Sequence, residues 1–476
     1  MKKPSEIYGF VVLENEQYPF FFDTKSFELE VFPPTITKWE DLRFDAFKLL
    51  GEKSKKHRWL EYYQVEGITS SNRQICFSIR EKPIINNGFR KYHVQWVLYD
   101  YTGDSENIIG IRITGGDINY FYPAENNLKS DFEYRDNHTI KKIIIESKEI
   151  INNPCGKFRC SKGVDANIEV FASSTFQFNN AEQPIYAKSS LNVDYSRALS
   201  IETVIKNIQD IRSFFIYAFY RSNIHFEEIV IYEKNNSDEK CKGGQILLPE
   251  NIQIEKNEKK KERVIKYDFW HTNMARMLSV IKNKKIGFEH ICSEINTTHS
   301  YPISRFIMIL TEFEKEYRNI YGNDSIRSIE YKLLKKEVVG LLNNLKEEKT
   351  GKDKNRLKSI IKGVNNTDDI YSERVKKALN DCKLIMNYFI KDKYNGSYKK
   401  NAEKIANRIG DIRNGIAHGK LNFKINAINV DDINIIERLM YAIRLKKYEK
   451  NDLRIAYVIA ELFGDDKIKN RIDFSK

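Results

Sequence analysis

Hydrophobic residues recur with two different periods along the chain, and the change of period divides the sequence into two parts. In the first part, short runs such as Phe27–Phe32 and His93–Tyr99 alternate between apolar and polar residues, which is typical of half-buried β-strands. From about Tyr267 onward, apolar residues recur every three or four positions, as in amphipathic helices. The pattern therefore predicts an α+β protein, with an antiparallel β-rich N-terminal domain over 1–265 and an all-α helical bundle over 266–476.

Short apolar runs separated by turn residues predict the strands of the N-terminal domain. The expected strands are Tyr8–Leu13, Phe27–Phe32, Glu61–Glu66, Gln74–Ile79, His93–Tyr99, Ile108–Ile113, Thr139–Ile145, Asn167–Phe171, Tyr186–Val193 and Glu228–Tyr232. One helix, Ile201–Arg221, interrupts the series, because its apolar residues fall on one side at helical spacing. The charged stretch Lys234–Arg263 is expected to be a polar loop or linker.

Helical periodicity predicts the elements of the second part. The expected helices are Trp270–Ile281, Ile303–Tyr321, Ser325–Leu345, Asp368–Lys391, Tyr398–Ala417, Val430–Lys446 and Asp452–Phe463. The charged run over 346–356 is expected to be a turn or a flexible link between two of them. Gly464 is suited to ending the last helix, because glycine commonly follows a helix C-terminus.

The helix expected over Tyr398–Ala417 has an apolar side and a polar side. Its apolar stripe alternates spacings of four and three and contains Tyr398, Ala402, Ile405, Ile409, Ile412 and Ile416. At about 100° per residue, Arg413 falls at the edge of this stripe. The opposite side carries Asn407, Asp411, Asn414 and His418. A guanidinium and an imidazole are therefore expected at one end of a helix, turned partly away from the core.

The charge of the chain favours an anionic partner. The net charge is +13 and the isoelectric point is near 9.1, and nucleic acid is the leading class of partner for such a chain. Lysines are scattered through nearly every segment, so part of this excess is expected to be solvated surface. No run of about 20 apolar residues is present, and the N-terminus lacks the apolar stretch of a signal peptide, so a cytoplasmic location without a membrane span is expected.

The cysteines do not form a metal-binding pattern. Of the 6 cysteines, only Cys155 and Cys160 lie close together in the sequence, and neither a second pair nor a nearby histidine completes a zinc site. Reduced, structural thiols are therefore expected, and no metal or other cofactor.

Arginine and histidine five residues apart form a weak pattern by themselves. Of the 8 histidines, only His418 has an arginine at that distance before it, and Asn414 lies one turn earlier on the same face. Gly410 and Gly415 each cost about 1 kcal/mol relative to alanine inside a helix, which is tolerated where a close approach is needed. Spacing alone leaves two interpretations open. One is a functional pair, and the other is a helix end where His418 meets the dipole and Arg413 is an ordinary surface charge.

The motif RNGIAH at Arg413–His418 resembles the R-N-x-x-x-H signature of HEPN domains, which are all-α bundles that are mostly metal-independent endoribonucleases. The segment ILTEFEKEYR, Ile309–Arg318, resembles an early helix of ApeA-type anti-phage HEPN proteins. The N-terminal strands and the helix LSIETVIKNIQDIRSFF are similar to the N-terminal domain of that family. The resemblance implies a HEPN-like bundle, ribonuclease activity and a role in anti-phage abortive infection, with the β-rich half as a sensing or regulatory domain.

The resemblance also implies roles for particular residues. The expected catalytic residues are Arg413, Asn414 and His418, and the expected supporting residues are Asp411, Glu314 and Arg318. A histidine can move protons near neutral pH, and an arginine can stabilise the negative charge that grows on a phosphorane. Glu314 and Arg318 are four residues apart, so an ion pair within their helix is favoured over a catalytic role.

The expected partners are RNA, with transfer RNA as one candidate, and a second copy of the chain. One histidine does not easily act as base and acid at once, so a homodimer or higher homo-oligomer with a composite site is expected. A phage-derived trigger is a further expected partner. Two alternatives stay open, namely a non-catalytic RNA-binding or dimerisation scaffold and the toxin of a toxin–antitoxin pair.

Overall fold

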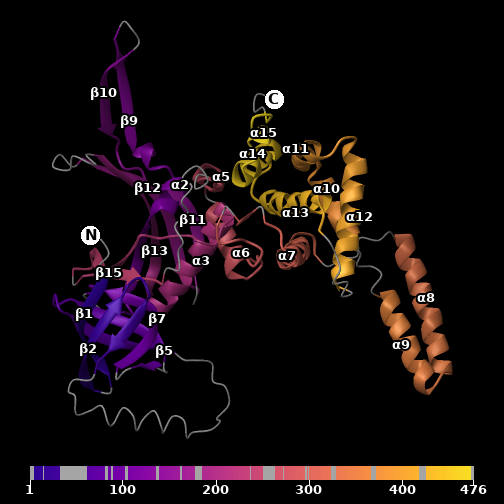
Figure 1. Cartoon of the computed structure of the whole chain (residues 1–476), viewed down its shortest axis with the longest axis horizontal. Helices are drawn as coiled ribbons and strands as arrows, with labels where there is room; N and C mark the ends of the chain where they lie inside the picture. Colours follow the sequence, from indigo (N-terminus) through magenta and orange to yellow (C-terminus); the bar gives the residue numbers. More distant parts are fainter. Residues whose placement is uncertain are drawn as a thin grey trace. The chain divides into compact units, whose positions relative to one another are not determined.

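The computed structural model shows an α+β chain whose contacts divide it into two units (Figure 1). It describes all residues except 1–4, 14, 33–61, 81–83, 87–88, 102–104, 136–138, 161–162, 177–184, 236, 250–262, 272, 295–296, 299, 323–328, 366–370, 418–424 and 473–476. The first unit comprises 1–218, 223–262 and 266–279, and the second comprises 219–222, 263–265 and 280–476. The domain boundary expected from the change of periodicity falls after residue 265, whereas residues 266–279 belong to the first unit. The strands lie in the first unit and most helices in the second.

The first unit begins with a closed ring of antiparallel strands. In order around the ring these are β7 (Phe89–Tyr99), β3 (Glu28–Val31), β2 (Glu16–Asp23), β1 (Glu6–Leu13), β4 (Tyr62–Thr69) and β5 (Gln74–Arg80), and β5 pairs with β7 to close it. Alternate side chains point inward and form one apolar core, which includes Val11, Phe20, Phe22, Leu29, Ile75, Phe77 and Val97. Closure leaves no strand edge unpaired within the ring.

Strand β7 also starts an open antiparallel sheet. This sheet continues through β15 (Lys240–Leu247), β14 (Glu228–Lys234), β8 (Ile108–Thr114), β13 (Ile185–Leu199), β12 (Asp165–Phe176) and β11 (Asn153–Arg159). Helix α3 (Ile201–Phe219) packs with α2 (Gly116–Phe121), because Phe121 meets Phe214 and Phe215 edge-on at 5.7 and 5.2 Å between ring centroids. Two further strands, β9 (Leu128–Tyr134) and β10 (Ile140–Ser147), form a separate hairpin.

Helix α13 (Ala427–Leu445) is the centre of the second unit. It packs against α7 (Ile303–Tyr321), α10 (Tyr371–Asp381), α11 (Lys383–Lys393), α12 (Tyr398–Ala417) and α14 (Asp452–Phe463). From Ile435 to Leu445 every residue of α13 is buried, as expected for a helix enclosed by others, whereas its first turn is partly exposed. A helical hairpin, α8 (Ile329–Glu348) and α9 (Gly351–Asn365), lies between α7 and α10 in the chain.

Buried ion pairs connect α13 to its neighbours. The pairs are Asp432–Arg408, Glu437–Arg305, Arg438–Asp465 and Arg444–Glu316. Asp432 accepts hydrogen bonds from both Nε and Nη2 of Arg408, at 2.6 and 2.7 Å. Removal of one partner of such a pair would leave a buried charge uncompensated, at a cost of about 3–5 kcal/mol. These pairs therefore restrict how α7 and α12 can rotate and slide against α13.

Most predicted elements are confirmed, although the first residues of three of them, at 61, 325–328 and 368–370, lie outside the described residues. Strands β2, β9 and β11, the short strand β6 (Ile84–Asn86) and helix α2 were not predicted. The helix expected over Trp270–Ile281 is two helices, α5 (Tyr267–Trp270) and α6 (Asn273–Lys282), and three further expectations differ. The stretch Lys234–Arg263, expected to be a loop, contains β15, because Lys240–Leu247 completes the hydrogen bonds of β14 and β7. The charged link over 346–356 contains the end of α8, a two-residue connection at 349–350 and the start of α9, whose Leu357 is buried. The single helix expected over Asp368–Lys391 is two helices, because Cys382 has non-helical angles, φ −103° and ψ 21°.

Within the described parts of the chain, no helix combines the length and the apolar character needed to cross a membrane.

His290 makes the stability of the second unit depend on pH. Its ring is buried near Tyr220, its Nδ1 has no hydrogen-bond partner among the described residues, and burial together with Arg305 and Lys315 lowers its pKa to about 3. In the unfolded chain the imidazole has a pKa near 6.5, so protonation favours unfolding. The contribution of His290 is fully present above pH 6.5 and decreases by about 1.4 kcal/mol per pH unit as the pH falls toward 3.

Urea unfolding of the full chain between pH 7 and pH 4.5, followed by helical circular dichroism, tests this prediction. The wild type is expected to lose stability more steeply than His290→Gln, which has no proton to gain. Equal slopes in the two proteins would contradict it.

Candidate functional site

Helix α12 has the two sides that its sequence predicts. Its bounds, Tyr398–Ala417, are those expected, and the stripe from Tyr398 to Ile412 is buried. Ile416, the last residue of the stripe, is only half-buried. On the opposite side, Asn407, Asp411 and Asn414 are exposed. Arg413 lies at the edge, and its side chain is 42% exposed.

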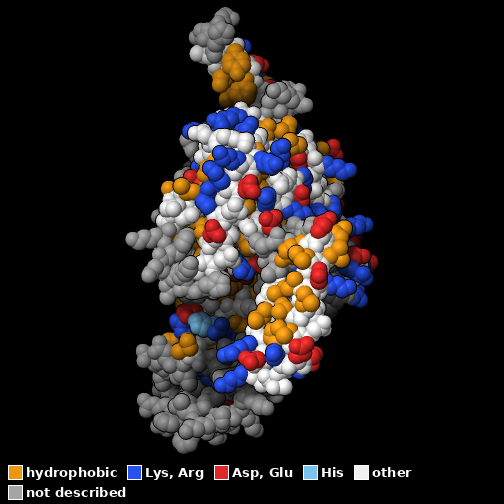
Figure 2. Space-filling view, turned by 90° about the vertical axis from the view of Figure 1, so that its right-hand side faces the viewer, with side chains coloured by type: hydrophobic (Ala, Val, Ile, Leu, Met, Phe, Trp, Pro, Cys, Tyr) orange, Lys and Arg blue, Asp and Glu red, His pale blue; other side chains and the backbone are white. Residues whose placement is uncertain are grey.

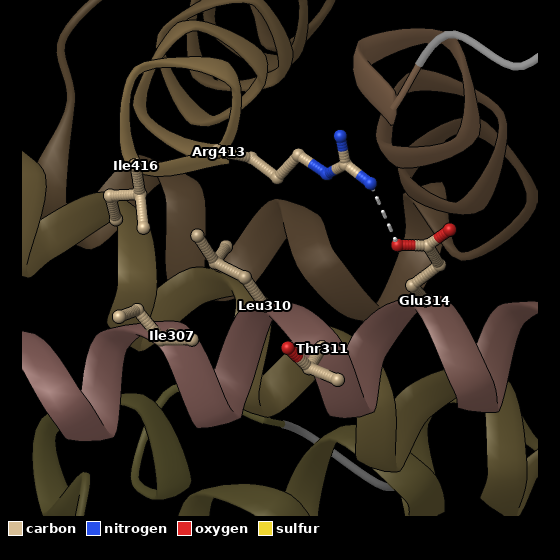
Figure 3. A pocket seen from close by; sticks show the side chains of 6 residues that line it. All are labelled: Ile307, Leu310, Thr311, Glu314, Arg413 and Ile416. Carbon is tan, nitrogen blue, oxygen red and sulfur yellow. Dashed lines mark ion pairs between the residues drawn. The ribbon is translucent and has the colours of Figure 1, made fainter. Parts of the chain in front are cut away.

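The guanidinium groups of three arginines converge on one carboxylate, that of Glu314 on α7. Arg318, one turn further along α7, donates to Oε1 at 2.7 Å, and Arg374 of α10 donates to the same oxygen at 3.0 Å. Arg413 reaches from α12 and places Nη2 at 3.5 Å from Oε2 (Figure 3). The predicted ion pair between Glu314 and Arg318 is thereby confirmed, and three helices contribute to one cluster.

This cluster favours an anionic ligand. Together its four side chains carry two more positive than negative charges, and Arg374 is buried, so its charge is poorly screened by water. Arg413 makes the longest of the three contacts with Glu314, and its side chain is 42% exposed, close to the 45% of Arg318. Arg413 is therefore the arginine best placed to turn toward a phosphate that arrives from solvent.

A neighbouring tyrosine has a structural role in this cluster. The guanidinium of Arg413 lies 6.0 Å from the centre of the Tyr371 ring, and the hydroxyl of Tyr371 donates to the carbonyl of Leu310 at 2.9 Å. Burial, and then the negative charge of Glu314, raise the pKa of Tyr371 well above its usual value, although Arg413 lowers it. Tyr371 therefore stays protonated near neutral pH and supports Arg413 as a packing surface.

A pocket of about 200 Å³ opens beside Arg413. It is lined by Ile307, Leu310, Thr311, Glu314, Arg413 and Ile416 (Figure 3). Small-molecule sites usually measure about 300–1,000 Å³, so this pocket suits a small group such as a phosphate better than a whole cofactor. Its wall is apolar on the side of Ile307 and Ile416 and charged on the side of Glu314 and Arg413.

The structure brings together only part of the predicted site. Arg413, Glu314 and Arg318 belong to one cluster, and Asn414 follows Arg413 in the last turn of α12. Asp411 is exposed and does not line the pocket, so no contact among the described residues supports its predicted role. His418 lies outside the described residues.

Arg374 was missed by sequence reasoning, although the sequence carries a signal for it. The buried residues of α10 recur at helical spacing and are Tyr371, Arg374, Val375, Ala378 and Leu379. An arginine at a position of an apolar stripe is unusual, because a buried charge needs a partner. Such a position points to an acidic residue on a facing helix, which here is Glu314.

Among the described residues, no group of three or more histidine, cysteine, aspartate or glutamate side chains could hold a metal ion. The expectation that no metal is needed stays a prediction.

Comparison of the chain with protein-family models, curated proteins and solved structures gives no match. That the chain is a HEPN protein therefore stays a prediction. The structural support for a functional site comes from the geometry around Glu314.

Gly410 sets the distance between α10 and α12, which carry Arg374 and Arg413. A Cβ at Gly410 would lie 2.9 Å from the Cβ of Ser372, whereas a Cβ at Gly340 of α8 would meet nothing within 4 Å. Gly410→Ala is therefore expected to destabilise the protein by about 1–3 kcal/mol through overpacking. Gly340→Ala is expected to stabilise it by up to about 1 kcal/mol, because alanine is the better helix former.

Thermal and urea unfolding of the two variants measures both changes. Adding Ser372→Gly to Gly410→Ala removes the facing Cβ and is expected to restore part of the loss. Stabilisation by Gly410→Ala would contradict the close approach of α10 and α12 at this residue.

Proposed function

We propose that this protein is a metal-independent endoribonuclease of the HEPN type that acts in anti-phage defence by abortive infection. The observation that carries the proposal is the placement of Arg413 at a phosphate-sized pocket, where it shares Glu314 with Arg318 and Arg374. The sequence adds Asn414 beside it and His418 five residues later. The resemblance to ApeA-type proteins supports the role in defence.

Cleavage proceeds by attack of the ribose 2′-hydroxyl on the adjacent phosphorus. The 2′-oxygen forms a bond to phosphorus, the bond from phosphorus to the 5′-oxygen breaks, and that oxygen takes up a proton. The products are a 2′,3′-cyclic phosphate and a 5′-hydroxyl. DNA lacks the attacking hydroxyl and is not cleaved.

Arg413 donates to the non-bridging oxygens of the phosphorane, where negative charge grows. His418 takes the proton from the 2′-hydroxyl or gives one to the leaving oxygen. Asn414 orients the imidazole or contacts the phosphate without adding charge. Glu314, held by Arg318 and Arg374, limits the positions that the Arg413 guanidinium can adopt.

A second copy of the chain completes the site. Two proton transfers are needed, and each copy offers one histidine in this motif. Asn414 is exposed on the side of α12 that faces away from the buried stripe, so it is accessible to a second copy. The active form is therefore a homodimer with a composite site.

Incubation of the purified full chain with transfer RNA and with total RNA in EDTA tests this proposal. Cleavage that leaves cyclic phosphate ends is expected, while DNA stays intact. Arg413→Ala and His418→Ala are each expected to lower the rate by at least about 100-fold, because each removes a group that acts in the transition state.

Arg454→Ala serves as the matched control. The Arg454 side chain is 41% exposed and pairs with Glu449 at the start of α14, so it resembles Arg413 in exposure but lies outside the pocket lining. Its cleavage rate should equal that of the wild type. RNA binding without cleavage by the wild type would favour the non-catalytic scaffold. A loss of activity in Arg454→Ala equal to that in Arg413→Ala would contradict a specific role of Arg413 in cleavage.

A further inference from the structure

The hairpin of α8 and α9 carries an apolar stripe that neither of its helices covers. Leu334 and Leu341 are 59% and 64% exposed and Leu345 is 41% exposed, while Val338 is half-buried between them. At about 100° per residue, these four side chains lie within about 60° of one another around α8. Figure 2, which views the side of the molecule at the right of Figure 1, shows hydrophobic side chains gathered in a stripe there.

The hairpin buries too little to hold itself together in water. No residue of α8 is buried, and in α9 only Leu357 is. A few polar contacts join the two helices, among them Lys354 with Glu347 at 3.2 Å. Exposed polar pairs contribute little, and helices of this length gain most of their stability from packing an apolar face. The stripe on α8 therefore needs a covering surface.

The spacing of the stripe is symmetric and fits a second copy of α8. Residues 334, 338, 341 and 345 follow one another at intervals of four, three and four, which reads the same in both directions. When two such helices pack antiparallel about a two-fold axis, Leu334 of one faces Leu345 of the other, and Val338 faces Leu341. Every member of the stripe is then covered by another member.

The charges of α8 favour the same antiparallel arrangement. Residues 329–338 contain three lysines and two glutamates, whereas residues 339–348 contain one lysine and two glutamates. The first half is therefore net positive and the second half net negative. Antiparallel packing places the positive half of each α8 beside the negative half of the α8 in the second copy. Parallel packing would place halves of the same net charge beside each other.

We propose that two copies of this chain associate through α8, with their stripes packed antiparallel about a two-fold axis. The resulting contact joins two hairpins into a four-helix arrangement. This inference does not depend on RNA cleavage, because none of its residues lines the pocket of Arg413.

Sedimentation equilibrium of the full chain tests the association. The wild type is expected to show twice the chain mass of 56.1 kDa. Leu341→Lys is expected to weaken the dimer at least tenfold, roughly the effect of placing a charge in a packed interface. Leu333→Lys is the matched control, because Leu333 is 63% exposed on the same helix but lies about 100° away from Leu334. A monomeric wild type, or equal effects of the two variants, would overturn the proposal.

Cross-linking tests the antiparallel register. Leu334→Cys and Leu345→Cys are prepared as separate proteins, mixed, and oxidised under conditions in which the parent protein gives no covalent dimer. The mixture is expected to form a disulfide between the two variants, whereas neither variant alone should do so, because its own cysteines lie about 16 Å apart along the axis. Cross-linking of either variant with itself, or none in the mixture, would overturn the register.

Discussion

The buried ion pairs of α13 are the constraint on which the candidate site depends. Two of them, Glu437–Arg305 and Arg444–Glu316, join α13 to α7, and Asp432–Arg408 joins it to α12. Apolar packing alone tolerates rotation and sliding, whereas a buried charge has one acceptable position opposite its partner. Because both helices are tied to α13, Glu314 on α7 and Arg413 on α12 are brought within 3.5 Å of each other.

The cluster around Glu314 differs from those pairs in its charge balance. Each pair on α13 matches one cation with one carboxylate, so it leaves no excess for a ligand. At Glu314 three guanidinium groups share one carboxylate, and the side chains of Arg318 and Arg413 are 45% and 42% exposed. Of these two, Arg413 also lines the open pocket. The helical unit thus combines charge-balanced ion pairs, which hold α13 to its neighbours, with a cluster around Glu314 whose net positive charge suits an anion.

The sequence predicts elements well where an apolar period is long and uninterrupted. Helix α12 and helix α14 have the bounds that their stripes predict, and Glu314 pairs with Arg318 as their spacing indicates. Features that depend on distant partners were missed. Strand β15 forms because two neighbouring strands offer hydrogen bonds, and closure of the ring depends on β5 returning to β7. Arg374 joins Glu314 only after α10 is folded onto α7, which local patterns do not describe.

The salt dependence of RNA binding tests most directly whether Arg413 contacts a phosphate. Affinities for a single-stranded 2′-O-methyl oligonucleotide, which lacks the attacking hydroxyl, are measured over a range of salt concentrations for the wild type, Arg413→Ala and Arg454→Ala. Each lost phosphate contact lowers the slope of log K against log salt by about 0.7. Arg413→Ala is expected to bind more weakly with a slope reduced by this amount, and Arg454→Ala to match the wild type. Unchanged affinity and slope in Arg413→Ala would contradict the account.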